Sequence, residues 1–317
     1  MDSKPSLNDA LLTGANGFLG RIFNLSLQPH FDITTLGRST NDHIFCDLSQ
    51  HTFQPNKSFH AIIHNAGKAH SIPHTPREEE AFYKDNVEGT QNLLRSLEKL
   101  KPLPSIFIFI SSIAVYGIKE GVCIDEQSPL NPQTPYAQSK ALAEKVALDW
   151  CEQNGVNWVI LRLPLVVGPT PPGNLGTMRN AIARKRYLRI TNNSARKSMV
   201  VAEDVAQLIP QLEGKKGCYN LTDSIHPTFP EIEDAIAKAL HKSIPLSLPK
   251  GLARLMGKLG DSMARTGLSL PFTTERFHKI TATLTFSDEK ARQELGWRPR
   301  PAIPYIREGG LEKRFPQ

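Results

Sequence analysis

Cysteine is scarce in this sequence, and long apolar runs are missing. Four of the 317 residues are cysteines, and no two of them form a CxxC pair. This spacing predicts reduced thiols and argues against a disulfide framework or a cysteine metal site. The N-terminus lacks the apolar segment of a signal peptide, and no run approaches the ~18 apolar residues of a membrane span. We therefore expect a soluble, cytoplasmic protein with no bound metal and no transmembrane segment.

Basic residues are in excess, but they are not gathered in one run. The formal net charge is +7, and the densest basic cluster lies between Arg179 and Arg189. A nucleic acid or a pocket for a diphosphate would use such residues, and the motifs described next favour the pocket, so no nucleic-acid partner is expected. The segment from Leu246 to Leu259 is moderately apolar and basic. Its composition favours a core or interface helix over a loose membrane association.

A glycine turn follows the first apolar segment. The run from Leu7 to Thr13 ends at Gly14, Gly17 and Gly20, and a helical pattern continues from there. A buried strand, a glycine turn and a helix start place backbone N–H groups and the helix dipole against a pyrophosphate. The Gly-x-x-Gly-x-x-Gly spacing lets the backbone approach the phosphates and lets the helix pack on its strand. The stretch therefore predicts a dinucleotide site.

The end of the second expected strand, Asp32 to Leu36, indicates which dinucleotide is bound. An acidic residue there would bind the ribose 2′-hydroxyl, whereas an arginine accommodates a 2′-phosphate. The sequence has Arg38 beside Ser39 and no acid next to them. We therefore expect NADP(H) to be preferred, with NAD(H) possible. Asp47, after the third expected strand, is placed near the adenine.

Ser112, Tyr136 and Lys140 are the candidate catalytic residues. If the segment after Pro135 is helical, Tyr136 and Lys140 lie one turn apart on one face, where the ammonium can lower the pKa of the phenol. Ser112 follows the apolar strand at residues 105–110, so it lies at the carboxyl edge of the sheet, where doubly wound folds bind ligands. A hydroxyl there can hold a substrate carbonyl while the tyrosine transfers a proton.

Alternating apolar strands and helices predict an α/β fold with a Rossmann-type, doubly wound parallel sheet. We expect a dinucleotide-binding domain over residues 1–168, with a return to it near residues 217–245. Residues 169–317 are expected to form mainly a smaller substrate-binding part, because the alternation weakens after a Pro/Gly-rich stretch at residues 169–176.

Seven blocks occur in a familiar order along nearly the whole chain. They are Thr13 to Gly20, Asn65 to Gly67, Ser111-Ser112 with Val115-Tyr116-Gly117, Tyr136 to Lys140, Leu161-Arg162 with Gly168-Pro169, Glu203 to Ala206, and Leu295 to Trp297. In this order the chain resembles the extended short-chain dehydrogenase/reductases, the NAD-dependent epimerase/dehydratase family acting on nucleotide sugars. The resemblance implies a homodimer formed through the helices around residues 86–100 and 136–153.

The resemblance also implies roles for single residues. Tyr136 would be the acid/base, Lys140 its partner and ribose anchor, and Ser112 the group that polarises the carbonyl. The implied cofactor-binding residues are Gly14, Asn16, Gly17, Phe18, Leu19, Gly20, Arg38, Asp47, Leu48, Asn65, Ala66, Gly67, Asn86, Tyr136, Lys140 and Pro164. The implied substrate-binding residues are Ser112, Asn174, Leu175, Lys197 and Arg276.

Departures from the family pattern narrow the expected reaction. Sugar 4,6-dehydratases have an Asp-Glu pair directly after the Ser/Thr, where this chain has Ile113 and Ala114, so a dehydratase is disfavoured. The leading hypothesis is a reductase of the 4-keto group of a UDP-6-deoxy-hexosulose in bacterial surface-polysaccharide synthesis. The alternative is a UDP-hexose 4-epimerase, acting on UDP-glucose or UDP-N-acetylglucosamine with tightly bound NAD. A remote alternative is a non-catalytic dinucleotide sensor, which would have no need of all three catalytic side chains.

Overall fold

A parallel sheet of seven strands forms the centre of the computed structural model, which describes all residues except 1–6, 70, 72, 244–245, 265–271 and 314–317. The strand order is β11-β7-β5-β4-β1-β2-β3, so the chain winds outward in both directions from β1 and β4. The strands are β1 (Asn8–Thr13), β2 (Phe31–Gly37), β3 (Ile44–Phe45), β4 (Ala61–His64), β5 (Ile106–Ser112), β7 (Asn157–Leu163) and β11 (Gly217–Asn220). The predicted α/β, Rossmann-type fold class is confirmed.

β5 shows why this sheet is buried on both faces. Successive side chains of a strand point to opposite faces. Ile106, Ile108 and Ile110 accordingly belong to one apolar cluster, and Phe107 and Phe109 belong to the other. An uninterrupted apolar run is what a central parallel strand needs, since helices cover it from both sides.

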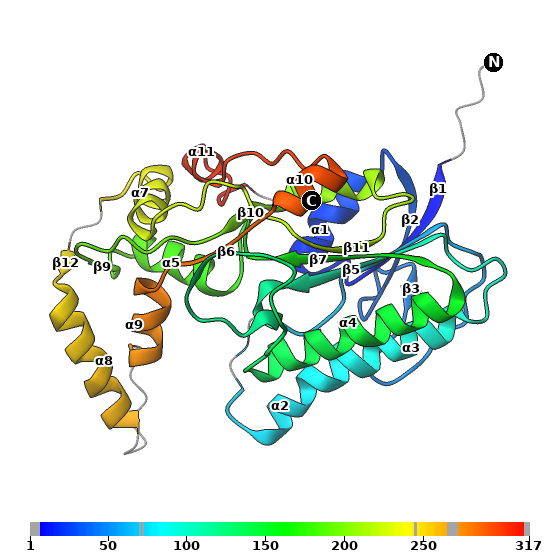
Figure 1. Ribbon diagram of the computed structural model, residues 1–317, viewed down its shortest axis with the longest axis horizontal. Helices are drawn as coiled ribbons and strands as arrows, with labels where there is room; N and C mark the ends of the chain where they lie inside the picture. Colours follow the sequence, from blue (N-terminus) through cyan, green and yellow to red (C-terminus); the bar gives the residue numbers. More distant parts are fainter. Residues whose placement is uncertain (1–6, 70, 72, 244–245, 265–271, 314–317) are drawn as a thin grey trace.

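Helices form a layer on each face of the sheet (Figure 1). α1 (Phe18–Leu27), α6 (Ala202–Leu208) and α10 (Glu289–Leu295) cover one face, and α3 (Gly89–Leu97) and α4 (Pro135–Asn154) cover the other. Local sequence fixes the start of α4. The hydroxyl of Thr134 accepts a hydrogen bond from the N–H of Ala137, and Pro135 occupies the first helical position. These signals place Tyr136 in the first turn of α4.

The helical region before β5 is not continuous. It is divided into α2 (Pro76–Tyr83), a π-helical turn η1 (Lys84–Glu88) and α3. The wider turn places Asn86 in the interior. Its side-chain NH₂ group donates to Ser139 Oγ at 2.8 Å, and its side-chain oxygen accepts from the N–H of Lys68 at 2.7 Å. Such π-turns occur frequently at functional sites, and this one ties α2 and α3 to α4.

The remaining elements form a smaller layer beside the carboxyl edge of the sheet (Figure 1). They include three parallel two-stranded pairs, β8 with β10, β9 with β12, and β6 with β13. The elements are η2 (Ile113–Tyr116), β6 (Gly121–Ile124), β8 (Leu165–Val167), α5 (Gly173–Ala183), β9 (Leu188–Ile190), β10 (Met199–Val201), α7 (Phe229–Ala239), β12 (Leu246–Leu248), α8 (Lys250–Ala264), α9 (Thr274–Thr281), β13 (Leu284–Phe286) and α11 (Ala302–Arg307). The short turn η3 (Ile209–Gln211) follows α6 and lies instead at the amino edge of the sheet.

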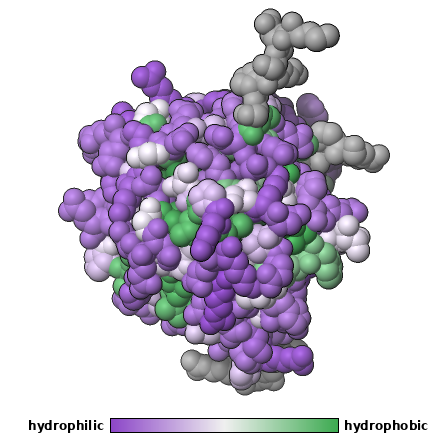
Figure 2. Space-filling model, turned by 90° about the vertical axis from the view of Figure 1, so that its right-hand side faces the viewer, coloured by the Kyte–Doolittle hydropathy of each residue, from purple (hydrophilic) through white to green (hydrophobic). Residues whose placement is uncertain are grey.

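The surface is largely polar where Figure 2 shows it, with small apolar patches between charged side chains. Within the described ranges, no helix combines the length and the apolar character needed to cross a bilayer. α8 and α9 stand together at the end of the molecule opposite the sheet's outer strands β2 and β3 (Figure 1).

Candidate active site

Ser112 and Tyr136 meet at the carboxyl edge of the central sheet. Ser112 is the last residue of β5, and its Oγ accepts a hydrogen bond from the N–H of Ala114 at 3.2 Å. The side chain of Tyr136, from the start of α4, lies beside this hydroxyl, close enough for Ser112 to influence the pKa of the phenol. The Tyr136 ring packs edge-on against Phe82, with 6.1 Å between the ring centroids. Two hydroxyl groups that were predicted to share one substrate oxygen therefore lie side by side.

Lys140 lies one turn beyond Tyr136 on α4 and is 6% exposed. Its Nζ donates to the carbonyl of Ile110 at 2.6 Å and lies 4.2 Å from the centre of the Phe109 ring. Burial lowers the pKa of Lys140 to about 8, while the carboxylate of Glu144 acts in the opposite direction. The lysine is thus held against the end of β5 by a backbone carbonyl and an aromatic face.

The pKa of Tyr136 differs from the sequence-based expectation. Burial raises it above the ordinary value of 10.0, the hydrogen bond from Ser112 lowers it in part, and the charge of Glu144 raises it further. The ammonium of Lys140 is directed to the carbonyl of Ile110, which explains why the phenol gains no stabilisation of its anion from that side. At neutral pH the phenol is therefore protonated, which is the state of a proton donor.

A buried polar network lies behind these residues, and the sequence reading missed it. Glu144, one further turn along α4, forms an ion pair with Arg162 of β7, with 2.7 Å between Oε2 and Nη2. The Ser111 hydroxyl donates to the same carboxylate, and Arg162 Nη1 donates to the hydroxyl of Tyr116 at 3.0 Å. Tyr116 in turn donates to the side chain of Asn220 at 2.9 Å. The spacing of Tyr136, Lys140 and Glu144 at four-residue intervals was the available signal for this shared helix face.

The glycine turn packs tightly against the backbone of its neighbours. Gly14 has φ of 69°, and a Cβ added there would lie 2.8 Å from the Cα of Ala66. A Cβ on Gly20 would lie 2.0 Å from the carbonyl oxygen of Gly14, so only glycine allows the start of α1 to pack here. Asn16, Gly17, Phe18 and Leu19 complete the turn and open α1. The positive end of α1 faces this turn, which suits a pyrophosphate.

The turn after β4 is bonded to the glycine turn. Thr13 Oγ1 accepts from the N–H groups of Asn65 and Ala66 at 3.1 and 3.0 Å. His64 lies between Thr13 and Thr90, and burial lowers its pKa to about 3. The histidine is therefore neutral and structural. Gly67 packs directly against Asn86, because a Cβ there would lie 2.5 Å from the Asn86 side-chain oxygen.

Arg38 and Asp47 lie just beyond the carboxyl ends of β2 and β3. The side chain of Arg38 is 66% exposed, and its guanidinium lies 3.7 Å from the carboxylate of Asp85. Asp47 accepts from the N–H and hydroxyl of Ser49 at 3.1 and 2.8 Å. The next residue, Leu48, is buried in the core beneath α3, and its carbonyl accepts from Asn92.

An acid that the sequence reading did not consider lies near Arg38. The carboxylate of Asp42 accepts from the Asn16 amide at 2.9 Å and from the Ser39 N–H at 3.1 Å. It is 9% exposed, and both contacts link the loop after β2 to the glycine turn. Its position indicates a residue that holds the loop in place.

The predicted substrate-side residues are distributed over three elements. Pro164 follows β7, and Asn174 and Leu175 lie in the first turn of α5. Leu175 is 1% exposed and packs in the core of the smaller layer, so its side chain is directed away from any ligand. Lys197 donates to the carbonyl of Ala282 at 2.8 Å, and burial lowers the pKa of Lys197 to about 8. Arg276 lies on the exposed side of α9.

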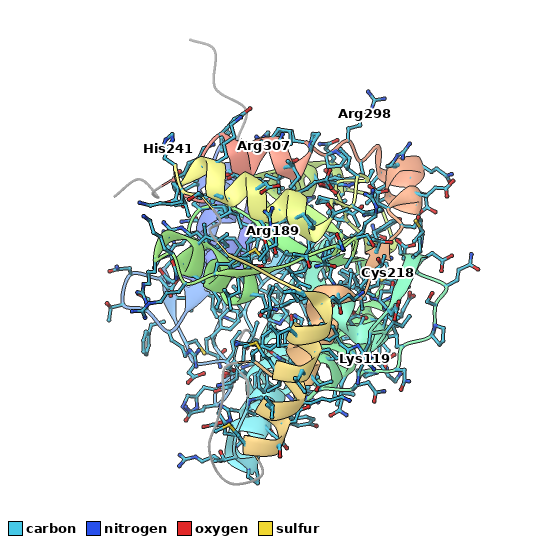
Figure 3. The ribbon with its side chains drawn as sticks, turned by 90° about the vertical axis from the view of Figure 1, so that its left-hand side faces the viewer. Lys119, Arg189, Cys218, His241, Arg298 and Arg307 are labelled. Atoms are coloured by element: carbon cyan, nitrogen blue, oxygen red, sulfur yellow. The ribbon has the colours of Figure 1, made fainter. Side chains whose placement is uncertain are left out.

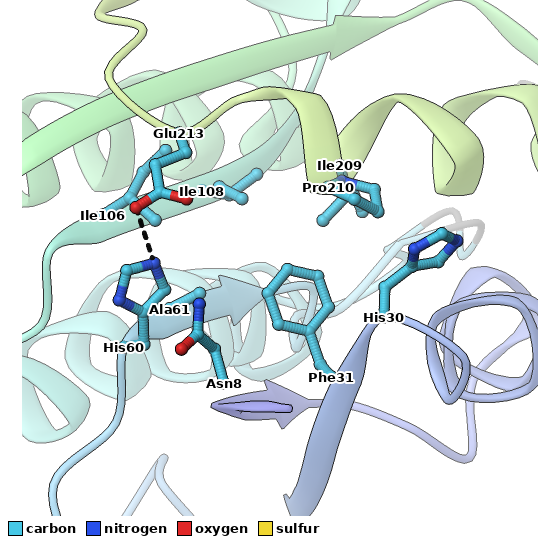
Figure 4. A pocket seen from close by; sticks show the side chains of 10 residues that line it. All are labelled: Asn8, His30, Phe31, His60, Ala61, Ile106, Ile108, Ile209, Pro210 and Glu213. Atoms are coloured by element: carbon cyan, nitrogen blue, oxygen red, sulfur yellow. Dashed lines mark ion pairs between the residues drawn. The ribbon is translucent and has the colours of Figure 1, made fainter. Parts of the chain in front are cut away.

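A hollow lies at the amino edge of the sheet, opposite the candidate site (Figure 4). It has a volume of about 230 Å³ and is lined near the amino ends of β1, β4 and β5 by Asn8, His60 and Ile106. His60 there pairs with Glu213 at 3.2 Å. Ligands of doubly wound sheets bind at the carboxyl edge, so this hollow is separate from the candidate site. In the described ranges, no group of three or more His, Cys, Asp or Glu side chains is arranged to hold a metal ion.

The model of the NAD-dependent epimerase/dehydratase family matches residues 10–215, which include the glycine turn, Ser112, Tyr136 and Lys140. The chain belongs to this family. It is therefore an NAD(P)-dependent, nucleotide-sugar epimerase or reductase of the extended short-chain dehydrogenase/reductase type.

Similar proteins include 4-epimerases. The chain is 26% identical to the N-acetyl-alpha-D-glucosaminyl-diphospho-ditrans,octacis-undecaprenol 4-epimerase of Escherichia coli O157:H7, over 97% of this chain and 94% of that protein. The fold is similar to that of Thermus thermophilus UDP-glucose 4-epimerase in complex with NAD, with a TM-score of 0.70 and 20% identity over 95% and 97% of the chains. It is also similar to that of RMD from Pseudomonas aeruginosa complexed with NADPH, with a TM-score of 0.71 and 20% identity over 96% and 98%.

Proposed function

We propose that the protein reduces the C4 carbonyl of a UDP-linked 6-deoxy-hexosulose with NADPH, in bacterial surface-polysaccharide synthesis. The observation that supports this proposal most directly is the placement of Ser112 beside a protonated, half-buried Tyr136 at the carboxyl edge of β5. A phenol that holds its proton at neutral pH is ready to give it to an oxygen that becomes negative during reduction.

The roles of the side chains follow from this geometry. Ser112 donates a hydrogen bond to the carbonyl oxygen of the substrate, which places that oxygen beside the Tyr136 hydroxyl. Tyr136 transfers its proton to the oxygen as negative charge develops there. Lys140, held by the carbonyl of Ile110, fixes the position of α4 behind the phenol and offers its remaining protons to the ribose. The nicotinamide, when bound, supplies the hydride.

The residues around the glycine turn would hold the dinucleotide. Gly14 and Gly20 let the turn pack tightly between the segment after β4 and α1, since a Cβ at either position would collide with backbone. The N-terminus of α1 would then bind the pyrophosphate. Arg38 is exposed beyond β2, within reach of a 2′-phosphate. This arginine is the reason for proposing NADP(H) over NAD(H). Asn174, Lys197 and Arg276 are proposed to face the nucleotide diphosphate.

A 4-epimerase with tightly bound NAD is the second candidate, favoured by the names of the similar proteins. In that reaction Tyr136 would first accept the proton of the C4 hydroxyl and later return it, and the same three side chains would serve both steps. The E. coli protein named above acts on a sugar linked through a diphosphate to a lipid. A diphosphate is also present in UDP-sugars, so cations that bind one substrate class suit the other.

The purified protein distinguishes the two candidates without an added cofactor. We would denature it, identify the released small molecules by mass, and titrate the stripped protein with NADPH and NADH. An empty site that prefers NADPH, with turnover of a UDP-4-keto sugar, supports the reductase. Retained NAD that NADPH does not displace, with interconversion of UDP-hexoses at C4, identifies the epimerase instead and refutes the proposal.

A further inference from the structure

α8 packs against its neighbours through its smallest residues. Ala253 is fully buried. A Cβ on Gly257 would lie 3.1 Å from the N of Thr274, and one on Gly260 would lie 2.0 Å from the carbonyl oxygen of Phe272. These three positions therefore form the inner face of the helix and allow a close approach to the start of α9. The contact leaves no room for large side chains between the two helices.

The large apolar side chains of α8 consequently face outward. Leu252, Leu255 and Leu259 are 48%, 53% and 55% exposed. At about 100° per residue, they fall within roughly 60° of the helix circumference and form one stripe. A surface helix normally turns its leucines to the core and its small or polar residues to water. The arrangement in α8 is the reverse, and Figure 3 shows the helix standing in front at this end of the molecule.

A basic stripe lies beside the leucine stripe. Lys250, Arg254 and Lys258 recur every four residues and are exposed, and at about 100° per residue Lys258 lies roughly 60° from Leu255. The acid of the helix, Asp261, accepts from the N–H of Thr274, so it belongs to the contact with α9. The exposed run at residues 184–186, Arg-Lys-Arg, precedes β9, and β9 pairs with β12 just before α8. Positive charge thus extends along this end of the molecule.

We propose that the outer face of α8 binds the surface of a membrane that contains anionic lipids. An amphipathic helix with leucines on one side and Lys/Arg beside them lies in the interface between head groups and acyl chains. The basic stripe complements the negative surface potential of such a membrane.

A second copy of this chain fits the same face less well. An antiparallel two-fold pairing of α8 with α8 brings both basic stripes to the same side of the contact, and Asp261 is already engaged with Thr274. Like charges would then lie opposite one another without a compensating acid from α8. Membrane binding also places α9, with its candidate substrate residue Arg276, next to the bilayer surface, since α8 and α9 pack together.

Vesicle sedimentation of the full-length protein tests the proposal, and it requires neither substrate nor turnover. Vesicles of phosphatidylcholine alone are compared with vesicles that also contain phosphatidylglycerol, at low and at high salt. The first variant combines Leu255→Ser with Leu259→Ser, and the second combines Arg254→Gln with Lys258→Gln. Leu25→Ser is the matched control, because Leu25 is a 42% exposed leucine on α1. Thermal unfolding and NADPH binding show whether each variant is folded.

The wild type and Leu25→Ser are expected to bind the anionic vesicles, and high salt to weaken this binding. The leucine variant is expected to lose binding by roughly ten-fold or more, because the inserted apolar area is removed. The arginine/lysine variant should lose its preference for the anionic vesicles.

The proposal is overturned if the wild type stays in solution with anionic vesicles at low salt, or if the leucine variant binds as well as the wild type. A leucine variant that instead changes its oligomeric state in sedimentation velocity, with vesicle binding unaltered, assigns the face to a second copy. None of these readouts depends on the reaction at C4, so the proposed function stands or fails separately.

Discussion

Glu144 and Arg162 form an ion pair that is buried on both sides, with exposed fractions of 4% and 8% for the two side chains. Glu144 comes from α4, which carries the proposed proton donor Tyr136, and Arg162 comes from β7, so the pair fixes the distance between that helix and the sheet. The Ser111 hydroxyl donates to the same carboxylate. Ser111 precedes the proposed catalytic Ser112, and Glu144 lies one turn beyond Lys140. The pair therefore positions both chain segments that form the site.

Replacing Glu144 by Gln is expected to destabilise the fold by about 3–5 kcal/mol, because the buried guanidinium of Arg162 loses its counter-charge. Combining Glu144→Met with Arg162→Met should recover much of this loss, since no uncompensated charge remains. Urea unfolding followed by circular dichroism measures the free energy of unfolding of the single and the double variant. Glu152→Gln, which breaks the exposed pair with Lys216, is the control and should change stability little. Equal losses in the single and double variants would contradict the role assigned to the ion pair.

Replacing Tyr136 by Phe is expected to lower kcat by roughly 10²–10⁴-fold, because the phenol is the proposed proton donor. The ring still packs against Phe82, so the fold and NADPH affinity should persist. Stopped-flow measurement of NADPH oxidation gives the rate, and fluorescence titration gives the affinity. Tyr83→Phe on α2, at a 44% exposed position, is the matched control. Turnover at the wild-type rate in Tyr136→Phe would exclude the assigned proton transfer.

The fold was predictable from the sequence because its signals are local. The apolar run of β5, the glycine turn before α1, and Thr134 with Pro135 at the start of α4 each determine their element within a few residues. The meeting of Ser112 with Tyr136 was also predictable, since the carboxyl ends of parallel strands share one edge of the sheet. The roles of these side chains in the reaction stay predictions.

Features that depend on contacts distant in sequence were not predictable. Arg162 meets Glu144 only because β7 pairs beside β5 beneath α4. The π-turn around Asn86 depends on its bonds to Ser139 and Lys68. The composition of residues 246–259 showed that the segment is moderately apolar and basic, but it could not show which side of α8 faces inward. The close contact of Gly257 and Gly260 with the start of α9 decided that question.

Buried charge on Lys140 is expected to make stability depend on pH. The folded chain lowers the pKa of Lys140 from 10.5 to about 8, a difference that corresponds to about 3 kcal/mol. Between these two values the unfolded chain binds more protons than the folded one, so the free energy of unfolding rises with pH there. Lys140→Met removes this contribution. The variant is therefore expected to be more stable than the wild type at neutral pH, and the difference should shrink as the pH rises from about 8 toward 10.5. Chemical unfolding across this range measures it, and a difference that is constant with pH would contradict the buried charge.

Replacing Arg38 by Ala is expected to weaken NADPH binding by roughly 10–100-fold, because a hydrogen bond between charged groups is lost. NADH has no 2′-phosphate, so its binding should change little. Asp85 provides a test of opposite sign. Its carboxylate lies 3.7 Å from the Arg38 guanidinium, so it competes with a 2′-phosphate for that cation and repels it. Asp85→Asn should therefore strengthen NADPH binding and leave NADH binding nearly unchanged. Fluorescence titration of the stripped protein with both dinucleotides measures these ratios, with Arg95→Ala on α3 as the control for loss of an exposed arginine. If the wild type binds NADH more tightly than NADPH and neither variant alters the ratio, Arg38 does not select the cofactor, and the NAD-dependent epimerase becomes the better assignment.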